Sequence, residues 1–560
     1  MAPSTISPSH VRDQVLVEIQ AVFSKNGATL ADYNLPVPTH TLIEQLGNTL
    51  LREEIAYDIH ELLLSAVNME DQLNPEQKKI YDAVLTAINT DKGGLFFLYG
   101  HGGTGKTFVY KAIISRLRST GKIVLAVASS GIASLLLPGG RTAHSRFKIP
   151  IDIHDQSTCH VKKGTHLADL LEQTSLIVWD EAPMAHRNCF EALDRSLNDI
   201  ISGDEFDGAY KPFGGKSVLL GGDFRQILPV VPKGSRSGTI HASIARSYLW
   251  KHCKIFYLKQ NMRLNAAGLN DEEISELAMF SKWLLNVGEG KIEAIAMHEE
   301  EESPTWIKIP DNLRVDPNEG DIQDITSAVY DGLSSMYSNA EYLKQRAIIT
   351  GTNAVVDELN AHILSLIPTE LKTYLSFDSI SNDDSASADM DVLYPTEFLN
   401  SLTFNGLPNH QLQLKVQSPV MLLRNINQSI GLCNGTRLII SRLGDRVVEA
   451  TIISGSHIGS RVYIPRIIMS AKESKWPFVM KRRQFPLRLS YAMTINKSQG
   501  QTLEKVGLYL PKPIFCHGQL YVALSRVTTY KGLRILIKNQ EDEQKFYTKN
   551  IVYNEIFDEL

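Results

Sequence analysis

Hydrophobic side chains in the first 70 residues recur at helical spacing. The stretch VRDQVLVEIQAVFSKNG, residues 11–27, places five apolar residues on one helical face before an Asn-Gly stop signal. A similar periodicity follows in TLIEQLGNTLLREEIAYDIHELLLSAV. The pattern predicts an N-terminal helical segment over residues 1–70.

Short apolar runs alternate with helical segments after LNPEQ, residues 73–77. The runs are LFFLYG (95–100), IVLAVA (123–128), SLIVWD (175–180), SVLLGGD (217–223) and IFYLKQ (255–260). Strands that alternate with helices are typical of a parallel sheet covered by helices on both faces. The pattern therefore predicts one α/β domain over residues 71–265.

A second α/β pattern begins at RAIITGTNAVVDELNAHIL, residues 346–364, which predicts a strand followed by a helix. Residues 411–485 are instead rich in strand-forming residues and punctuated by Gly and Asn, which favours a small β-barrel insert. The later segment RLSYAMTINKSQGQTL returns to α/β character. We expect a helical connector over 266–340 and a second α/β domain over 341–410 and 486–560, interrupted by the insert.

Composition narrows the class of protein further. The chain has 560 residues, of which 43% are hydrophobic and 21% charged, so a single small module and wholesale disorder are excluded. With 57 Lys and Arg against 62 Asp and Glu the net charge is −5, so nucleic-acid binding would require a local groove. Five scattered cysteines exclude a disulfide framework. Because no signal peptide, typical transit peptide or membrane-length apolar run is visible, we expect a soluble intracellular protein.

The sequence GHGGTGKT, residues 100–107, fits the phosphate-binding pattern GxxxxGK[ST] and stands between a predicted strand and a predicted helix. Glycines allow backbone N–H groups to face phosphates, and a helix N-terminus adds a favourable dipole. We expect Lys106 to reach the β- and γ-phosphates of ATP and Thr107 to ligate Mg²⁺. A glycine-rich turn is the structural alternative. The predicted nucleotide contacts in this loop are Gly102, Gly103, Thr104, Gly105, Lys106 and Thr107.

The run SLIVWD ends in Asp180, and Glu181 follows it. A buried strand that delivers a carboxylate beside a phosphate loop can provide a second protein ligand for Mg²⁺, and the next carboxylate can orient or deprotonate a water. We therefore predict Asp180 as a metal ligand and Glu181 as the general base. Taken alone, such an acidic pair is more often a helix N-cap.

Three further polar residues are candidates for the nucleotide site. Gln226 follows the third apolar run, where a side-chain amide can contact the γ-phosphate and the attacking water, although a surface turn residue is an equal alternative. Arg263 follows a strand of the first domain, and Arg526 lies in the second α/β region. Arginines can stabilise charge that develops on the γ-phosphate, and one carried by a different domain does so when the domains close. A surface salt bridge is the commoner role of any single arginine.

Ten motifs occur in an order that identifies a family. They are LNPEQ, GHGGTGKT, ASSGIAS with GGRTAHSRFKIP, WDEAPM, GGDFRQILPV, LKQNMRL, TGTNAVVDELN, LLRNIN with GLCNGTRL, YAMTINKSQGQT and GQLYVALSRV. Together they resemble the Pif (petite integration frequency) family of superfamily-one DNA helicases, relatives of the RecD helicases. WDEAPM, SVLLGGDFRQILPV, YPTEFLNSL and GLCNGTRL look most like the helicase portion of Helitron rolling-circle transposons.

The resemblance implies two RecA-like P-loop domains with parallel sheets, a small wedge insert around 148–168 in the first and an SH3-like β-barrel insert in the second. It implies an ATP-driven helicase that moves from the five-prime to the three-prime end of single-stranded DNA and opens single-strand/duplex junctions. It also implies that Gln77 contacts the adenine edge. Roles in DNA repair, recombination and telomere maintenance, a monomeric state, and a nuclear or alternatively mitochondrial location are family expectations.

Strand binding requires donors for phosphates and flat surfaces for bases. In open α/β sheets such groups lie on loops at the carboxyl ends of strands. The predicted contacts are Thr142, His144, Ser145, Phe147, Thr352, Asn353, Thr494, Lys497, Ser498 and Gln499. For Phe147 the commoner alternative is a place in the hydrophobic core.

Three polar or charged stretches have weaker interpretations. Residues 298–304 and 376–391 are acidic and are interpreted as solvated loops. The triplet Lys481-Arg482-Arg483 could flank the DNA track, act as a nuclear signal or be solvated.

Two other functions remain open from the sequence. A nucleotide-gated clamp would bind nucleic acid without stepping, and it would not need Arg263 or Arg526. A rolling-circle transposase needs two histidines separated by one residue, and none of the 16 histidines has that spacing. The chain could still be the helicase portion of a transposon protein.

Overall fold

The computed structural model of the chain divides into two compact units. The first comprises residues 1–268 and 553–560, and the second residues 269–552. The structure describes residues 48–201, 210–265, 270–297, 303–316, 321–380, 393–455, 457–472, 476–538 and 546–560, with a few isolated positions elsewhere. The helix predicted over 11–27 therefore lies mostly outside the described residues.

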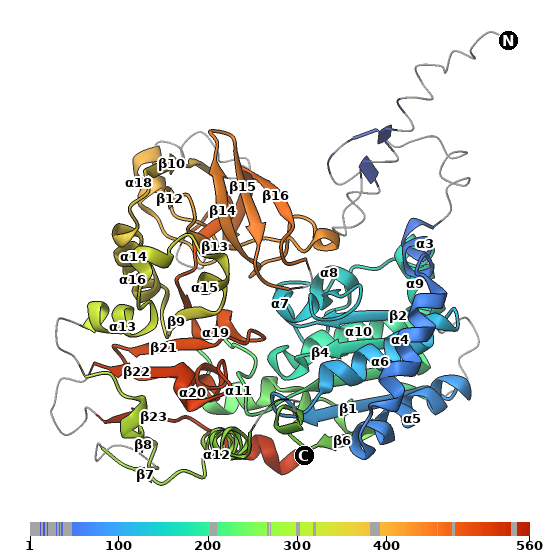
Figure 1. The fold of residues 1–560 in the computed structure, drawn as a ribbon. Coiled ribbons are helices and arrows are strands. Elements are labelled where there is room, and N and C mark those ends of the chain that lie inside the picture. The colour runs from blue at the N-terminus through green and yellow to red at the C-terminus, as the bar shows by residue number, and fades with distance from the viewer. Residues whose placement is uncertain are drawn as a thin grey trace. The chain divides into compact units, whose positions relative to one another are not determined.

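The first unit is built on a six-stranded sheet in which every pair of neighbours is parallel (Figure 1). The strand order is β3-β2-β4-β5-β1-β6. The strands are β1 (Gly94–Gly100), β2 (Ile123–Ala128), β3 (Arg141–Thr142), β4 (Thr174–Asp180), β5 (Ser217–Gly222) and β6 (Cys253–Leu258). Phe96 and Phe97 alternate between two buried clusters, one on each face, which explains why the strands are apolar throughout.

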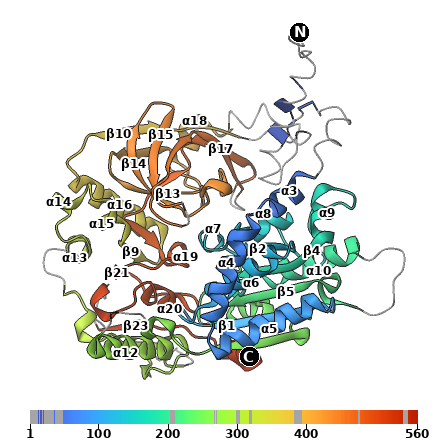
Figure 2. The same cartoon turned by 45° about the vertical axis from the view of Figure 1, so that its right-hand side comes forward.

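Helices cover both faces of this sheet. They are α3 (Thr49–Ile55), α4 (Ile59–Asp71), α5 (Pro75–Asn89), α6 (Lys106–Ser119), α7 (Gly131–Ser134), α8 (Ala143–Phe147), α9 (His166–Gln173), α10 (Arg187–Ile201) and α11 (Arg236–Ala242). The helices α5 and α6 pack against each other, and α4 lies along α6, as Figures 1 and 2 show. The predicted helical character of the N-terminal segment is thus present in α3 and α4.

The last eight residues belong to the first unit, whereas the sequence pattern assigned them to the second domain. Ile556 is buried in the first unit's core. The indole Nε1 of Trp250 donates to the carbonyl oxygen of Glu559 at 3.0 Å, and Arg236 pairs with Glu555 at 2.8 Å. The tail follows two short strands, Leu533–Ile537 and Tyr547–Lys549. The tail itself has no periodic pattern of apolar residues, so the sequence did not indicate which unit it packs against.

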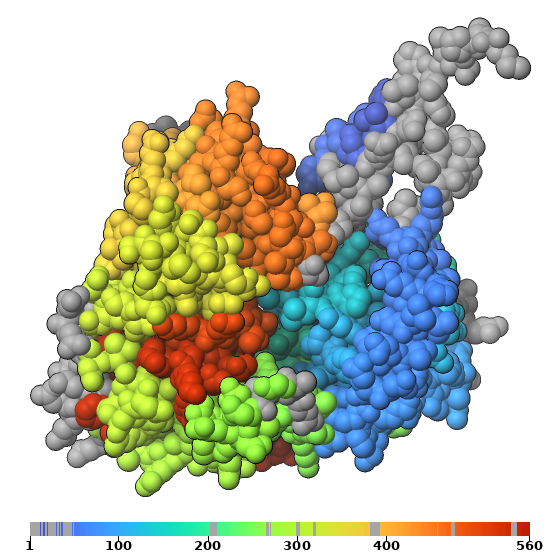
Figure 3. Space-filling model, in the orientation of Figure 1, coloured from blue at the N-terminus to red at the C-terminus, as the bar shows by residue number. Residues whose placement is uncertain are grey.

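The second unit contains a four-stranded parallel sheet of order β20-β9-β21-β22. Its strands are β9 (Arg346–Thr350), β20 (Ala492–Thr494), β21 (Lys505–Leu510) and β22 (Leu533–Ile537). The helices of this unit are α12 (Asp271–Gly288), α13 (Asp321–Val329), α14 (Leu333–Met336), α15 (Ala340–Lys344), α16 (Asn353–Leu366), α18 (Thr396–Ser401), α19 (Ile495–Ser498) and α20 (Gln519–Leu524). Residues from both ends of the unit's sequence form one continuous surface in Figure 3.

The segment predicted as a helical connector also contains strands. Within it β7 (Ala294–Ile295) and β8 (Trp306–Lys308) pair with each other, and β8 pairs with β23 (Tyr547–Lys549) in a small antiparallel sheet. These strands are two or three residues long, which is too short for an alternation of apolar and polar residues to be recognised in the sequence.

An antiparallel insert interrupts the second unit, as the sequence predicted, but it begins earlier than residue 411. Its largest sheet has the order β16-β15-β14-β13-β19, and smaller sheets pair β10 with β12 and order β11-β18-β17. The strands are β10 (Leu371–Leu375), β11 (Phe377–Ile380), β12 (Gln411–Lys415), β13 (Pro419–Leu422), β14 (Arg437–Leu443), β15 (Val447–Ile452), β16 (Arg461–Pro465), β17 (Ile467–Lys472), β18 (Val479–Gln484) and β19 (Leu487–Leu489).

The acidic stretch 376–391 is not a solvated loop throughout. Residues 377–380 form β11, and the Asp378 side chain is fully buried against Arg482. The rest of the stretch, like most of 298–304, lies outside the described residues. A strand of four residues beside an acidic run does not differ from a loop by composition.

The region around 148–168 forms a loop that is tied to α10, followed by the start of α9. The amide of Cys159 donates to Ser196 Oγ at 2.8 Å, and Arg195 donates to the carbonyl of Ser157 at 2.6 Å. Ile151 is 92% exposed at the start of this loop. The loop is therefore held at its base while an apolar side chain faces solvent.

Candidate nucleotide and nucleic-acid sites

The predicted phosphate loop joins β1 to α6, and its backbone requires glycine. Gly103 and Gly105 have φ of +92° and +85°. A Cβ on Gly105 would lie 2.4 Å from Nε2 of Gln77, and one on Gly103 would lie 2.8 Å from Oδ1 of Asn261. A residue with a side chain would be strained by this positive φ, and its Cβ would displace the side chains of Gln77 and Asn261. The loop thus brings backbone amides to the N-terminus of a 14-residue helix, the geometry that binds phosphates.

Lys106 and Thr107 open α6 at the end of this loop. The Lys106 ammonium donates to the carbonyl oxygens of Gly100 and His101. Thr104 is buried, and its hydroxyl donates to the His101 carbonyl at 2.9 Å. Thr107 is half-buried in the first turn of the helix. The predicted phosphate contact and the predicted metal contact are therefore consecutive residues in the first turn of α6.

The acidic pair lies at the end of β4, in a strained turn. Burial raises the pKa of Asp180, and the positive charge of Lys106 opposes that rise. The Asp180 carboxylate accepts from the amide of Glu181 at 2.9 Å. Glu181 has φ 52° and ψ 36°, a left-handed conformation that is unfavourable for a residue with a side chain and that clusters at functional sites.

The predicted sensor Gln226 is buried one turn after β5, and its backbone N–H donates to the Asp223 carbonyl at 3.1 Å. Asp223 is fully buried and pairs with Arg225 at 3.1 Å. Burial lowers the pKa of His101, and the charge of Asp223 opposes that change. Asp223 and Arg225 were not assigned roles from the sequence, although an aspartate that ends a buried strand is a signal that could have identified Asp223.

Neighbouring strands bring these residues together. In the sheet β5 lies between β4 and β1. All three strands are parallel, so Asp180, Asp223 and the phosphate loop stand at the same edge. The arrangement is a cluster of two buried carboxylates, one lysine and a set of backbone amides.

Gln77 already uses its side-chain amide within the protein. It forms a capping box with Asn74 at the start of α5, and its Nε2 donates to the Thr104 carbonyl at 3.2 Å. Gln77 therefore supports the phosphate loop, and the predicted contact with adenine stays a prediction.

The two predicted catalytic arginines have different surroundings. Arg263 lies beside the phosphate loop, because a Cβ on Gly103 would be 3.2 Å from its Cδ. Arg526 is buried in the second unit and donates to the carbonyls of Val522 at 2.8 Å, Gln501 at 2.9 Å and Ser498 at 3.2 Å. The guanidinium of Arg526 is thus fixed to the turn that ends α19.

The predicted strand contacts of the first unit lie on and before α8, and Phe147 is wrongly placed among them. Thr142 and Ser145 are half-buried and His144 is exposed. Phe147 is fully buried, with its ring 6.0 Å from the ring of Trp179. Phe147 follows the buried Ala143 by four residues on a short helix, so both face the core.

The predicted strand contacts of the second unit follow β9 and β20, which pair in parallel. Thr352, Asn353 and Lys497 are exposed and Thr494 is half-buried. Ser498 and Gln499 are buried, with 0% and 2% exposure, and the Ser498 hydroxyl donates to the Ile495 carbonyl. Their side chains are therefore part of the core under α19 and do not offer a surface for DNA.

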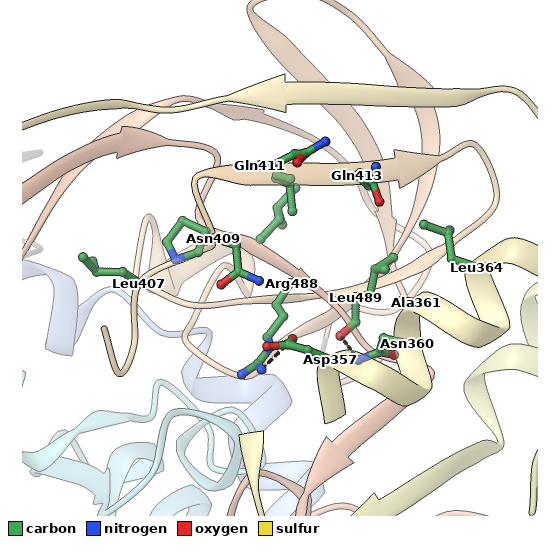
Figure 4. Close-up of a pocket in the computed structure, with 13 residues that line it drawn as sticks. Asp357, Asn360, Ala361, Leu364, Leu407, Asn409, Gln411, Gln413, Arg488 and Leu489 are labelled. Atoms are coloured by element: carbon green, nitrogen blue, oxygen red, sulfur yellow. Dashed lines mark hydrogen bonds and ion pairs between the residues drawn. The ribbon is translucent and has the colours of Figure 1, made fainter. Parts of the chain in front are cut away.

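Arg488 positions Asn353, a role that the sequence did not reveal. Its Nη1 donates to Oδ1 of Asn353 at 2.7 Å, and its Nη2 donates to Asp357 at 2.6 Å. This ion pair lines a pocket of about 200 Å³ between α16, β12 and β19 (Figure 4). Arg488 thus holds the carboxamide oxygen of Asn353, and the NH₂ group of Asn353 donates to Oδ1 of Asn405 at 3.5 Å.

Lys497 belongs to a group of cations in the second unit. Its ammonium donates to Oδ1 of Asn434 at 3.1 Å. Desolvation by the surrounding protein lowers the pKa of Lys497, and the charges of Arg488 and Arg424 lower it further. Three positive side chains therefore share one region, which favours an anionic ligand.

Within the described residues, no three His, Cys, Asp or Glu side chains converge as a metal site, and no helix is long and apolar enough to span a membrane.

Two family models match this chain. The model of PIF1-like helicases matches residues 72–298, and that of the DNA helicase Pif1 2B domain matches residues 397–443, inside the antiparallel insert. The chain thus resembles PIF1-like helicases over both of these regions.

Curated relatives of this PIF1-like chain span most of its length. The human ATP-dependent DNA helicase PIF1 is 27% identical over 89% of this chain and 67% of that protein. The Psychrobacter ATP-dependent DNA helicase Pif1 is 26% identical over 81% of this chain and 67% of its own length. The chain thus spans about two thirds of the length of these relatives.

Solved structures show the same fold. Bacteroides Pif1 in complex with ADP-AlF3 and ssDNA matches with a TM-score of 0.59 at 24% identity, covering 87% of this chain and 96% of that chain. Candida albicans Pif1 matches with a TM-score of 0.55 at 22% identity, covering 87% and 98%. The predicted family, fold class and enzyme class are confirmed. The Helitron branch stays a prediction.

Proposed function

We propose that this PIF1-like chain is an ATP-dependent DNA helicase that moves from five-prime to three-prime along single-stranded DNA and unwinds duplex. The observation that carries the proposal is the cluster of Lys106, Asp180 and Asp223 beside a loop in which Gly103 and Gly105 have the positive φ that favours glycine. Relatives named ATP-dependent DNA helicase support it, as do solved neighbours bound to ssDNA. The polarity rests on the resemblance of motifs alone.

The chemistry follows from the first unit's residues. Loop amides and Lys106 would bind the phosphates of ATP, and Thr107 and Asp180 would hold Mg²⁺ because both offer the oxygen ligands that this ion prefers. The ion would neutralise charge on the phosphate oxygens. Glu181 would orient and deprotonate the attacking water, and Gln226 and Arg263 would contact the γ-phosphate.

Strand binding would be linked to hydrolysis through Arg526. This arginine would stabilise the transition state when the two units close on ATP. Its guanidinium is bonded to the carbonyls of Ser498 and Gln501, in the segment that also carries Lys497. A strand that displaces Lys497 would therefore displace the support of Arg526. Stacking in duplex DNA averages about 1.4 kcal/mol per base-pair step, so an advance of one nucleotide per ATP would suffice for unwinding.

The wider role is proposed from the family. We infer that the protein acts as a monomer at single-strand/duplex junctions in DNA repair, recombination and telomere maintenance, in the nucleus or alternatively the mitochondrion. A clamp that binds DNA without stepping is the competing function. The two differ in whether ATP turnover moves the protein.

Unwinding of partial duplexes tests the proposal. The purified chain should separate a duplex with a five-prime single-stranded tail in the presence of ATP and Mg²⁺, and it should leave a three-prime-tailed duplex intact. Lys106→Ala is the matched control and should abolish unwinding while the strand is still bound. DNA binding without separation of either substrate would favour the clamp, and separation of the three-prime-tailed substrate would reverse the polarity.

A further inference from the structure

Three strands of the insert form a sheet with one buried and one open face. In the order β11-β18-β17, Phe377 pairs with Arg483 and Arg483 pairs with Ile468. Two residues along, Ser379 pairs with Lys481 and Lys481 with Ser470. Residues that are paired across strands lie on the same face of a sheet, so these six side chains share one face.

The opposite face of this sheet is buried against the rest of the insert. Arg482 donates to Asp378 through Nε at 2.9 Å and Nη2 at 2.7 Å, and both side chains are 0% exposed. Arg482 also donates to the carbonyls of Pro408, Leu399 and Leu402. Because the side-chain direction alternates along a strand, the buried Arg482 forces Lys481 and Arg483 outward.

The open face combines an aromatic ring with positive charge. Phe377 is 70% exposed and Ile468 is 66% exposed. Arg483 is exposed and Lys481 is half-exposed, and none of the six outward residues is acidic. An exposed aromatic ring beside cations on a sheet is the composition of surfaces that stack bases and hold phosphates.

The face is continuous with the predicted strand contacts. Arg424 donates to the carbonyl of Ser470, on the edge strand β17, at 3.1 Å. The charge of Arg424 also lowers the pKa of Lys497. Positive groups therefore extend within the second unit from Lys497 through Arg424 to Lys481 and Arg483.

We propose that the face formed by Phe377, Lys481, Arg483 and Ile468 is a second binding surface for single-stranded DNA. The strand would leave the contacts at Lys497, pass Arg424 and stack a base on Phe377 while Lys481 and Arg483 hold phosphates. This inference rests on the proposed function, because the strand is the ligand of both surfaces. The exposed ring favours unpaired bases, since bases in a duplex are already stacked.

The test compares a face variant with a matched control. The face variant is Phe377→Ala with Arg483→Gln. The control is Tyr463→Ala with Arg461→Gln, because Tyr463 is 64% exposed and the Arg461 side chain 77% exposed on β16 of the same insert. Both variants leave Arg482 intact, and thermal melting establishes that each is folded. Affinity is measured for oligothymidylates of about 8 and about 30 nucleotides, because a single strand-binding module such as an OB-fold covers about 4–16 nucleotides and only the longer strand exceeds that range.

The face variant should bind the long oligonucleotide about tenfold more weakly, equivalent to about 1.4 kcal/mol, with the short one unchanged. Loss of one phosphate contact should also reduce the salt slope for the long strand by about 0.7. The control should match the wild type. Equal affinity of the face variant and control for the long strand would overturn the proposal, as would a loss confined to duplex DNA.

Failure of this inference is distinguishable from failure of the proposed function. Wild-type protein that binds neither oligonucleotide would remove the helicase function and the second surface together. Wild-type protein that binds both, with a face variant that loses neither, would remove the second surface alone.

Discussion

The carboxylate of Glu54 joins helix α3 to helices α6 and α8 within the first unit, and its removal should destabilise that unit. Glu54 pairs with Arg146 and, at 3.3 Å, with Arg118, and the three side chains are at most 6% exposed. Arg146 lies in α8, between the predicted strand contact His144 and the core residue Phe147. Glu54→Gln would leave two buried guanidinium groups without this carboxylate.

Breaking a buried ion pair by removing one partner costs about 3–5 kcal/mol. Each kcal/mol lowers the melting temperature of a unit of this size by about 2–4 °C, so a loss near 4 kcal/mol predicts a fall of roughly 8–16 °C. The neighbouring Glu53 provides the control, because its side chain is 37% exposed and pairs with Arg141 at 3.1 Å. Glu53→Gln should cost at most about 1 kcal/mol.

Thermal unfolding followed by circular dichroism measures both variants under the same conditions. We expect a large fall in melting temperature for Glu54→Gln and a small one for Glu53→Gln. If both variants melted within about 2 °C of each other, the pair would not stabilise the unit as a buried pair does.

Three further substitutions test the site and the core. Glu181→Gln should keep ATP binding, measured by nucleotide titration, and lose hydrolysis, measured by phosphate release. Loss of ATP binding would indicate that Glu181 has a structural role instead. Burial raises the pKa of Asp180, so its ionised form destabilises the protein above the ordinary Asp pKa of about 4. Asp180→Asn should therefore raise the melting temperature at neutral pH, and this gain should vanish near pH 3. The same variant should lose ATP hydrolysis. A lower melting temperature at neutral pH would contradict the reasoning. Phe147→Ala should lose about 3–5 kcal/mol of stability in denaturant unfolding because Phe147 is fully buried, whereas weaker DNA binding at unchanged stability would restore its strand role.

The nucleotide site was predictable because its chemistry is local. The glycines of the phosphate loop are contiguous with the lysine after them, and the acidic pair is contiguous with its apolar strand, so each motif is visible in the sequence before the parallel sheet brings the two together. Asp223 could have been predicted in the same way, because it also follows an apolar strand. Arg488 was not, because it acts on Asn353 from 135 residues away.

The errors occurred where tertiary packing decides the role of a side chain. In Lys481-Arg482-Arg483 the middle residue is buried and its neighbours point outward, because a buried Asp378 from another strand pairs with it. Phe147 faces the core by its place on α8. The insert begins at β10 because Leu371–Leu375 pairs with a strand about 40 residues later, a long-range contact that local periodicity does not contain.

The central claim is that single-stranded DNA in the second unit controls ATP turnover in the first. The most direct measurement is the rate of ATP hydrolysis with and without single-stranded DNA, for the wild type and for Arg526→Ala. We expect a large stimulation by DNA that the variant loses while it still binds ATP. Equal wild-type rates with and without DNA would contradict the claim and leave a nucleotide hydrolase that is not driven by its strand.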